Sequence, residues 1–129
     1  DGLKAGSRLA EHELNAVGDK GSIIVVVATD APLNERQLKR VCKRAAVGLI
    51  RTGSFIGNGS GDIIVSFSTA NRVKHYEKDT SVEMKVLNEN YIDKIFRAAA
   101  EATEEAILNS LVCADGCVGR DGNERASLR

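Results

Sequence analysis

The stretch from Gly21 to Leu33, GSIIVVVATDAPL, decides the interpretation of this sequence. Its centre, residues 23–28, is apolar throughout and mostly β-branched, which is typical of a strand buried on both faces. Pro32 cannot donate a ladder hydrogen bond, so the strand is predicted to end before it. Asp30 directly follows the strand and is interpreted as a turn residue rather than a site residue.

A helix is predicted after this strand. Asn34 is a candidate N-cap, and Gln37, three residues later, completes a weak capping box. Gly53 is a candidate helix stop. Cys42 lies inside the helical pattern and is interpreted as a small core residue. The apolar stripe of this helix consists of Leu38, Val41, Cys42, Ala45 and Leu49.

A second strand and a second helix follow along the chain. The Gly-rich loop 57–62 leads into a predicted strand at 63–68, and apolar residues recur at helical spacing over 92–110. The order strand, long helix, strand predicts a crossover between parallel strands, and hence an α/β fold. Weaker patterns predict short strands over 3–10 and 82–87 and a loop over 15–20.

The crossover has a geometric consequence for three polar residues. Ser22 opens the first strand, and Ser60 and Asp62 open the second, so all three belong to the same end of the sheet. Neighbouring strands lie about 4.8 Å apart. Residues two apart in an extended chain face the same side. Two serines and a carboxylate are therefore predicted to converge there.

Length and composition limit the class of protein. The 129 residues suffice for one modest domain, and 43% hydrophobic with 28% charged residues is ordinary globular composition. The 18 Lys and Arg residues balance the 18 Asp and Glu residues, so net charge provides no attraction to nucleic acid or to a membrane surface. The longest apolar run, over 23–28, is too short to span a bilayer.

The cysteines and histidines do not form a recognisable metal or disulfide pattern. Three cysteines cannot make a closed disulfide framework, so a reducing, cytoplasmic compartment is expected. Cys113 and Cys117 are four residues apart and lack the further ligands of a zinc site. His12 and His75 are interpreted as surface residues. Neither a metal nor a cofactor is predicted.

Gly21 and Ser22 form the first candidate site. The conformational freedom of Gly21 allows a strained peptide, with the Ser22 hydroxyl directed at the Gly21 carbonyl. Attack would move the acyl group from nitrogen to oxygen, and water would cleave the ester. Ser22 would then be an N-terminal nucleophile whose own α-amine, with an ordinary pKa of about 7.7–8.0, serves as base. The alternative is an ordinary loop glycine before a serine that opens a strand. Considered without the rest of the sequence, the pair Gly21 and Ser22 favours this alternative.

Ser60 and Asp62 form the second candidate site. They could make a relay in which Asp62 orients Ser60 and Ser60 orients the Ser22 amine. A phosphate cradle is the second interpretation, but the loop leads into a strand and has no following Gly-Lys-Ser/Thr. An ordinary turn is the third, and the spacing alone favours it.

The first predicted helix carries many cations. They could contact a nucleic-acid backbone. The chain is neutral, however, and has no Trp, only two Tyr and three Phe for stacking on bases. A solvated outer face is therefore favoured. The cations are Arg36, Lys39, Arg40, Lys43, Arg44 and Arg51.

Four stretches together give the sequence a family resemblance. The first is 21–33, and the second is the loop 57–62 with its continuation through 66–71. The third is 101–109 and the fourth is 119–122. In this order and spacing, they resemble the self-processing subunit of the L-aminopeptidase/D-esterase and β-peptidyl aminopeptidase family. The resemblance covers nearly all of 21–122.

The resemblance implies a fold and site roles. The fold would be an αββα sandwich of the self-processing aminopeptidase and ornithine acetyltransferase type, of which this chain supplies roughly a third. The precursor would cleave itself between Gly21 and Ser22, and Ser22 would attack amides or esters that carry a free amino end. Ser60 corresponds to the second active-site serine. Asp62 corresponds to an acidic residue that is Glu in some members, one methylene longer.

The resemblance also implies how the chain is organised. Residues 1–21 would be the tail of a preceding alpha segment, and residues 22–129 a beta subunit in the same single domain. The alpha segment would supply an oxyanion-stabilising Asn and much of the substrate pocket, so this chain is expected to be inactive alone. A homo-oligomer of processed heterodimers is expected, acting on peptides or amino-acid amides, with no nucleic-acid or membrane partner.

Two alternatives to a self-cleaving aminopeptidase or amidase follow from the same resemblance. Ornithine acetyltransferases have a similar architecture and process themselves, but their nucleophile is Thr, and Ser22 argues against this activity. A catalytically silent relative that kept the fold is the other alternative. The presence of Ser22, Ser60 and Asp62 together argues against it.

Overall fold

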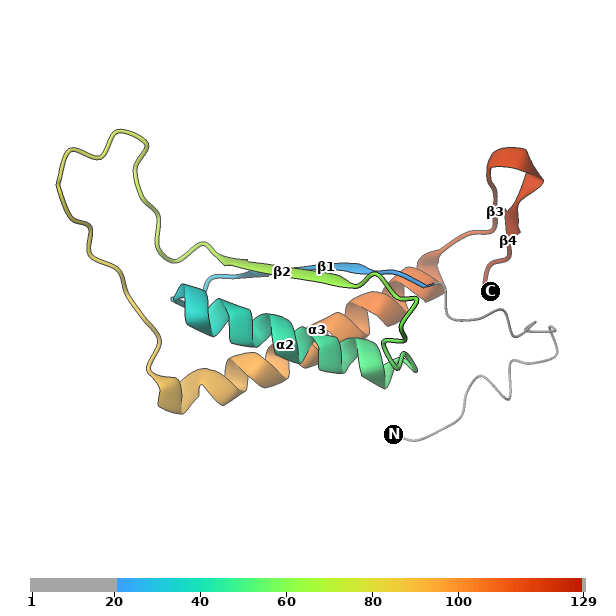
Figure 1. Ribbon diagram of the computed structural model, residues 1–129, viewed down its shortest axis with the longest axis horizontal. Helices are drawn as coiled ribbons and strands as arrows, with labels where there is room; N and C mark the ends of the chain where they lie inside the picture. Colours follow the sequence, from blue (N-terminus) through green and yellow to red (C-terminus); the bar gives the residue numbers. More distant parts are fainter. Residues whose placement is uncertain (1–20, 129) are drawn as a thin grey trace.

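The computed structural model describes residues 21–128 and contains a parallel sheet covered by helices on one face (Figure 1). Strands β1 (Ile24–Thr29) and β2 (Ile63–Ser68) pair in parallel, from Ile24 opposite Ile63 to Thr29 opposite Ser68. The strand–helix–strand prediction is confirmed. The predictions for 3–10, 15–20 and His12 lie outside the described residues.

Helix α2 (Glu35–Arg51) begins and ends where the sequence predicts. The Asn34 side chain accepts a hydrogen bond from the Gln37 backbone amide (2.9 Å), and the Gln37 side chain accepts one from the Asn34 amide (3.1 Å). This is the predicted capping box. At the other end, the Thr52 hydroxyl donates to the Leu49 carbonyl (2.7 Å), and Gly53 follows with φ +107°. That left-handed conformation favours glycine and ends the helix.

The core lies mainly between α2 and helix α3 (Ile92–Cys113). Val41 is fully buried on α2 and packs in one cluster with Phe96 of α3. Cys42 differs from its prediction as a core residue. It is half-buried on the side of α2 that faces β2, and its thiol contacts the Ser66 hydroxyl (3.1 Å). A polar neighbour is tolerated there because the site is not fully dry.

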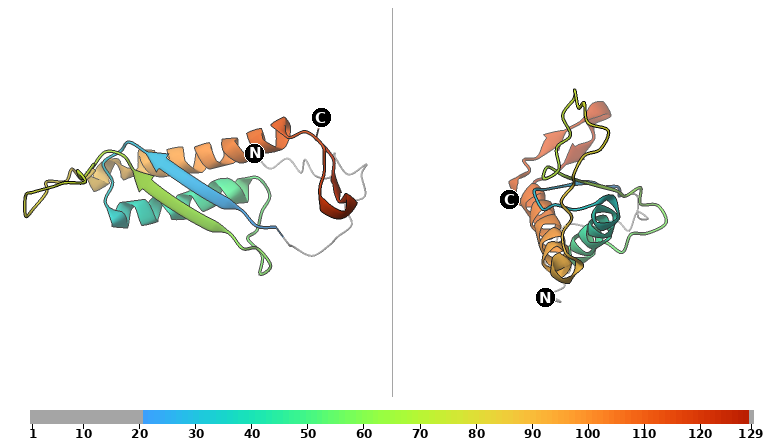
Figure 2. Two further views of the ribbon diagram at one scale, coloured as in Figure 1. Left: turned by 90° about the horizontal axis from the view of Figure 1, so that it is seen from above. Right: turned by 90° about the vertical axis from the view of Figure 1, so that its left-hand side faces the viewer.

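Strand β1 is covered on one face only, contrary to the prediction of a strand buried on both. Its side chains alternate, and Ile24 and Val26 are 71% and 61% exposed. β2 exposes Val65 and Phe67 in the same way. The reason is architectural: both helices lie on the same side of the sheet, as Figures 1 and 2 show, and no described element covers the opposite face. A row of exposed apolar side chains results.

The segment after β2 and the C-terminal tail also differ from expectation. Residues 82–87 form no strand, because the loop is closed by a side chain: Asn71 accepts from the Lys85 amide (3.0 Å) and donates to the Lys85 carbonyl (2.8 Å). A short helical turn, η1 (Glu89–Tyr91), leads into α3.

The Gly-rich tail contains an unpredicted hairpin, made of β3 (Cys117–Val118), η2 (Arg120–Gly122) and β4 (Glu124–Arg125).

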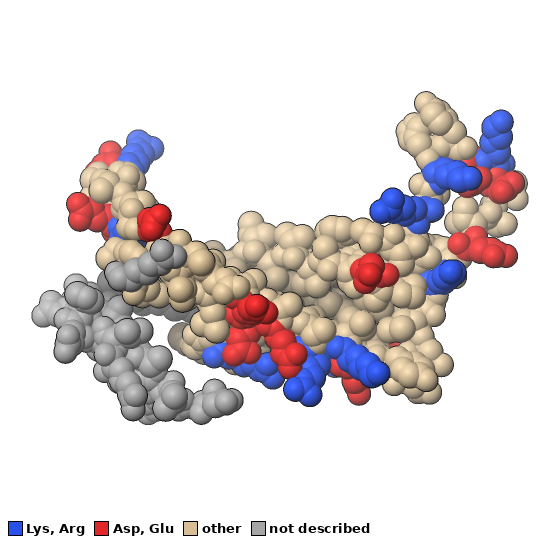
Figure 3. All heavy atoms as spheres, turned by 180° about the vertical axis from the view of Figure 1, so that it is seen from behind, with Lys and Arg blue, Asp and Glu red and all other residues tan. Residues whose placement is uncertain are grey.

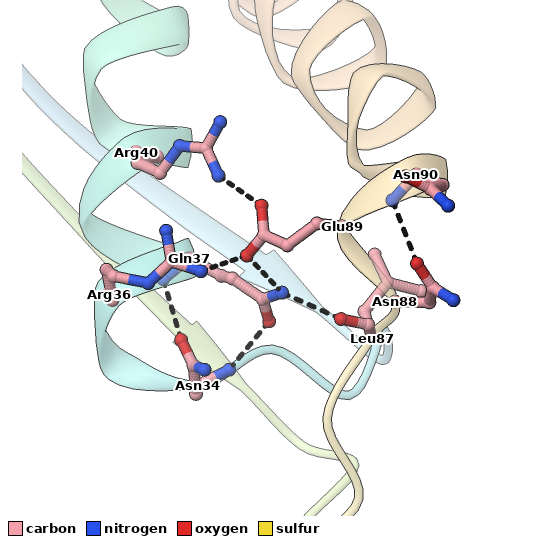
Figure 4. Close-up of polar contacts among 8 residues, drawn as sticks. All are labelled: Asn34, Arg36, Gln37, Arg40, Leu87, Asn88, Glu89 and Asn90. Carbon is pink, nitrogen blue, oxygen red and sulfur yellow. Dashed lines mark hydrogen bonds and ion pairs between the residues drawn. The ribbon is translucent and has the colours of Figure 1, made fainter.

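A carboxylate anchors the end of the long loop to α2 (Figure 4). The fully buried Gln37 side chain donates to the Leu87 carbonyl (2.8 Å) and to Glu89 (3.0 Å), and Arg36 and Arg40 pair with Glu89. The Gln37 amide, followed by these two guanidinium groups, lowers the pKa of Glu89 below its ordinary value. Glu89 is therefore ionised near neutral pH, and the anchor is complete there.

Four of the six cations on or beside α2 have partners within the chain. Arg36 and Arg40 pair with Glu89, and Arg51 pairs with Glu104 at 3.2 Å. Arg44 stacks over the Phe96 ring at 4.2 Å. Figure 3, which views the molecule from the side opposite to Figure 1, shows basic and acidic side chains intermixed rather than separated below the sheet. These contacts support the interpretation as a solvated outer face. Within residues 21–128, neither helix has the length and apolar character required to cross a bilayer.

We predict that Gly48→Ala destabilises the protein at the α2–α3 crossing. A Cβ at Gly48 would lie 2.4 Å from the Ala100 carbonyl oxygen and 2.8 Å from the Glu104 nitrogen, which are backbone atoms of α3. Helix propensity alone would favour alanine by up to about 1 kcal/mol. Overpacking should outweigh it and lower the free energy of unfolding by about 1–3 kcal/mol.

Urea unfolding of the full-length protein measures this effect. Gly119→Ala is the matched control, because its Cβ would meet only the Asn123 carbonyl oxygen at an ordinary 3.5 Å. A Gly48→Ala protein as stable as the wild type would contradict the close helix crossing.

Candidate active site

The lead-in segments of β1 and β2 lie side by side at the amino ends of the parallel strands, where Figure 2 shows them together. The Ile63 amide donates to the Ile23 carbonyl (2.9 Å), which extends the pairing beyond the first residue of β1. Ser22 precedes β1, and the segment 60–62 precedes β2. The structure therefore brings together the three residues that the sequence places at this end of the sheet.

Asp62 connects the two lead-in segments through one carboxylate oxygen. Its Oδ1 accepts from the Ser60 hydroxyl (2.8 Å) and from the Ile23 backbone amide (3.2 Å). Its Oδ2 is buried and has no hydrogen-bond partner among the described residues. A buried carboxylate oxygen without a partner is costly in a folded protein. A hydrogen-bond donor placed next to this oxygen would therefore stabilise the carboxylate.

The lead-in segment of β2 contacts Ser22. The Gly61 backbone amide donates to the Ser22 hydroxyl oxygen (3.2 Å). The hydroxyl acts as acceptor in this contact, so its own proton remains available for donation elsewhere. Ser22 is exposed, whereas Ser60 and Asp62 are half-buried. An accessible hydroxyl thus lies beside a more protected polar pair, which is a suitable arrangement for a nucleophile and its supporting groups.

The predicted relay has two links, and the structure contains the first. Asp62 accepts a hydrogen bond from the Ser60 hydroxyl (2.8 Å), which is the contact that this link requires. The second link, from Ser60 to a free Ser22 amine, stays a prediction, because the Ser22 nitrogen belongs to a peptide bond in this continuous chain. The loop itself turns through a hydrogen bond from the Ser60 amide to the Gly57 carbonyl (2.9 Å), so the turn and the polar pair coexist.

The remaining candidate residues lie outside this cluster. Asp30 is exposed and follows the carboxyl end of β1, opposite to Ser22. His75 is exposed on the long loop, edge-on to the Tyr76 ring. Cys113 and Cys117 are exposed free thiols. Within residues 21–128, no group of three Cys, His, Asp or Glu side chains is arranged to hold a metal ion.

Sequence reasoning did not single out Gly61, although its amide makes the contact to Ser22. The sequence contains a signal for it, since Gly61 stands directly between Ser60 and Asp62. In an extended segment, the backbone groups of alternate residues point to the same edge, so the amide of Gly61 points to one edge of the strand and those of Ser60 and Asp62 to the other. That inference requires the register of the two strands, which only the structure supplies.

Comparison with known proteins agrees with this fold. A protein from Pyrococcus horikoshii OT3 has a TM-score of 0.77 and 59% identity, over 83% of this chain and 30% of that one. The L-aminopeptidase D-Ala-esterase/amidase of Ochrobactrum anthropi, described as a variant of the Ntn (N-terminal-nucleophile) hydrolase fold, has a TM-score of 0.72 and 40% identity, over 79% and 28%. The chain therefore has an α/β fold of the Ntn hydrolase type.

The sequence profile of peptidase family S58 matches residues 1–125, and the chain belongs to this family. Beta-peptidyl aminopeptidase BapA of Sphingosinicella microcystinivorans is 50% identical over 107 residues, which are 83% of this chain. That region is only 27% of the relative's length. The chain thus spans about a quarter to a third of the relatives that it matches.

Proposed function

We propose that the full-length protein is a self-cleaving serine aminopeptidase or amidase whose nucleophile is Ser22. The observation that carries the proposal is the cluster at the amino ends of β1 and β2. There, an exposed serine hydroxyl accepts from the Gly61 amide, next to a carboxylate that is bonded to Ser60. Membership of peptidase family S58 and the aminopeptidase names of its relatives support the reaction class.

Self-cleavage proceeds by transfer of an acyl group from nitrogen to oxygen. The Ser22 hydroxyl oxygen attacks the Gly21 carbonyl carbon, the bond from that carbon to the Ser22 nitrogen breaks, and the hydroxyl proton ends on that nitrogen. An ester between Gly21 and Ser22 results. Water then hydrolyses the ester, which leaves a carboxylate on Gly21 and both a free amine and a free hydroxyl on Ser22.

The same serine then acts on substrate. Its oxygen attacks the carbonyl of an amide or ester, its α-amine takes the proton and delivers it to the leaving group, and water releases the acyl product. Asp62 and Ser60 orient the new amine. The Oδ1 of Asp62 already accepts from the Ile23 amide and the Ser60 hydroxyl, whereas its buried Oδ2 has no partner among the described residues and is suited to accept a further donor. Substrates with a free amino end are proposed, in keeping with the relatives' names.

The preceding alpha segment is proposed to complete the fold and the site, with the boundary at residues 21 and 22. Bonds from Ile63 to Ile23 and from Thr69 to Thr29 show that the odd-numbered residues of β1 direct their backbone groups toward β2. The even-numbered ones face the other edge, where no described strand pairs. A groove of about 420 Å³ runs along this edge, lined by β1 and α3.

These surfaces explain why the chain is proposed to be inactive alone. The open edge of β1 and the exposed apolar residues Ile24, Val26 and Phe67 are unfavourable in water. A segment that adds strands and covers this face would bury them and supply the remaining substrate pocket.

An assembly of processed heterodimers is part of the proposal. A cytoplasmic location also stays a proposal, based on the cysteine usage alone.

The intact mass of the full-length product, measured under denaturing conditions, tests the proposed function. Two fragments whose masses place the break between Gly21 and Ser22 are expected, and the second must begin with a free serine amine. A single uncut mass after prolonged incubation would contradict self-cleavage at this bond. It would instead favour the catalytically silent alternative, whereas transfer of acetyl groups between amines by the cut protein would favour the acyltransferase.

A further inference from the structure

The Gly61 amide is held rigidly in front of Ser22. It belongs to the peptide between Ser60 and Gly61, and both flanking residues are fixed. The Ser60 backbone amide is bonded to the Gly57 carbonyl (2.9 Å), and the Ser60 hydroxyl is bonded to Asp62 (2.8 Å). Asp62 in turn holds the Ile23 amide (3.2 Å). The donor is therefore oriented before any reaction begins, which is the condition under which a hydrogen bond lowers a barrier most.

Gly61 has no side chain, and this leaves space for the Ser22 hydroxyl. A Cβ placed there would lie 3.1 Å from the Ser22 hydroxyl oxygen and 3.9 Å from the Ser22 Cβ, and both atoms that it would meet within 4 Å belong to Ser22. Backbone conformation gives no other reason for glycine. The described glycines with positive φ are Gly53 and Gly122, not Gly61. Space for the Ser22 hydroxyl is thus the requirement that this position meets.

We propose that the Gly61 backbone amide is a fixed hydrogen-bond donor to the attacking oxygen of Ser22, a role that rests on the proposed function. As the hydroxyl loses its proton, partial negative charge develops on this oxygen before bond formation passes that charge to the carbonyl oxygen, and the amide stabilises the Ser22 oxygen at that point. The same oxygen is the leaving group when water cleaves the ester, and the amide stabilises it again. The role applies to self-cleavage and to turnover, since both use this oxygen.

Gly61→Ala in the full-length protein tests the proposal in two reactions. Self-cleavage, followed by intact mass over time, should slow by at least about tenfold, because the added methyl group displaces the Ser22 oxygen from its donor. Turnover of an amino-acid p-nitroanilide, normalised to the amount of cleaved protein, should show a similar loss in kcat, with KM within about twofold of the wild type. A merely blocked substrate pocket would raise KM and leave self-cleavage unchanged, because self-cleavage needs no bound substrate.

Gly119→Ala is the matched control. It adds the same methyl group in the C-terminal hairpin, where its Cβ would meet only the Asn123 carbonyl oxygen, at an ordinary 3.5 Å, and no atom of Ser22. Wild-type rates are expected. A second variant removes the donor without adding bulk: glycolic acid in place of Gly61 converts the amide into an ester. It should slow both reactions even where Gly61→Ala impairs folding.

Rates within twofold of the wild type for the glycolic acid variant would overturn the proposal. This failure is distinct from failure of the proposed function. If Ser22→Ala still cleaves itself, the nucleophile assignment is wrong and the Gly61 amide has no reacting oxygen to serve. If Ser22→Ala is inactive while both Gly61 variants react normally, only the role of the amide is wrong.

Discussion

Ser22→Ala in the full-length protein should abolish both self-cleavage and hydrolysis of amino-acid p-nitroanilides. The substitution removes the only atom proposed to attack a carbonyl. Among the described residues, the Ser22 hydroxyl is the one that the Gly61 amide contacts, so no second hydroxyl is placed to replace it. Loss of a nucleophile in enzymes that form an acyl intermediate costs about 10⁶-fold in rate. Intact mass should therefore show one uncut chain, and turnover should fall below detection.

Protein stability should hardly change, which separates this effect from unfolding. Ser22 is exposed, and among residues 21–128 its hydroxyl accepts one hydrogen bond, of 3.2 Å, from the Gly61 amide. Loss of one exposed hydrogen bond costs at most about 1 kcal/mol. Ser81→Ala, an exposed serine on the long loop, is the control that should process and turn over normally. Self-cleavage of Ser22→Ala at the usual position would show that another group attacks the Gly21 carbonyl.

The elements that carry the site could be predicted from the sequence because their signals are local. A β-branched run specifies β1, and the pair Asn34 and Gln37 specifies the start of α2 through contacts within one helical turn. Parallel pairing then follows from the crossover. Once the strands are parallel, counting from each strand start is enough to bring Ser22, Ser60 and Asp62 together.

Other features required partners that lie far away in the sequence. Residues 82–87 alternate like a strand, but the Asn71 side chain takes the place of a neighbouring strand at Lys85. The apolar pattern of β1 predicts cover on two faces, whereas the described residues cover one. The contact from Gly61 to Ser22 depends on register. In each case local composition is compatible with several partners, and only the tertiary arrangement selects one.

Asp62→Asn should slow self-cleavage and turnover by about 10²-fold or more while it changes stability little. Asparagine keeps the shape of the side chain and one oxygen acceptor, so the bonds to the Ser60 hydroxyl and to the Ile23 amide can persist. It removes the negative charge that is proposed to orient the Ser22 amine through Ser60. Rates from intact mass and p-nitroanilide turnover, and urea unfolding of the same preparations, measure the two effects separately.

Asp62→Glu separates charge from reach at this position. Glutamate restores the carboxylate but adds one methylene, and the two contacts of Oδ1, at 2.8 and 3.2 Å, leave little room for a longer side chain unless the lead-in segment of β2 moves. If charge alone matters, the glutamate variant should recover most of the rate lost in Asp62→Asn. If exact placement beside Ile23 also matters, recovery should be partial. Unchanged rates in Asp62→Asn would remove Asp62 from the mechanism and leave it as a residue that fixes the turn before β2.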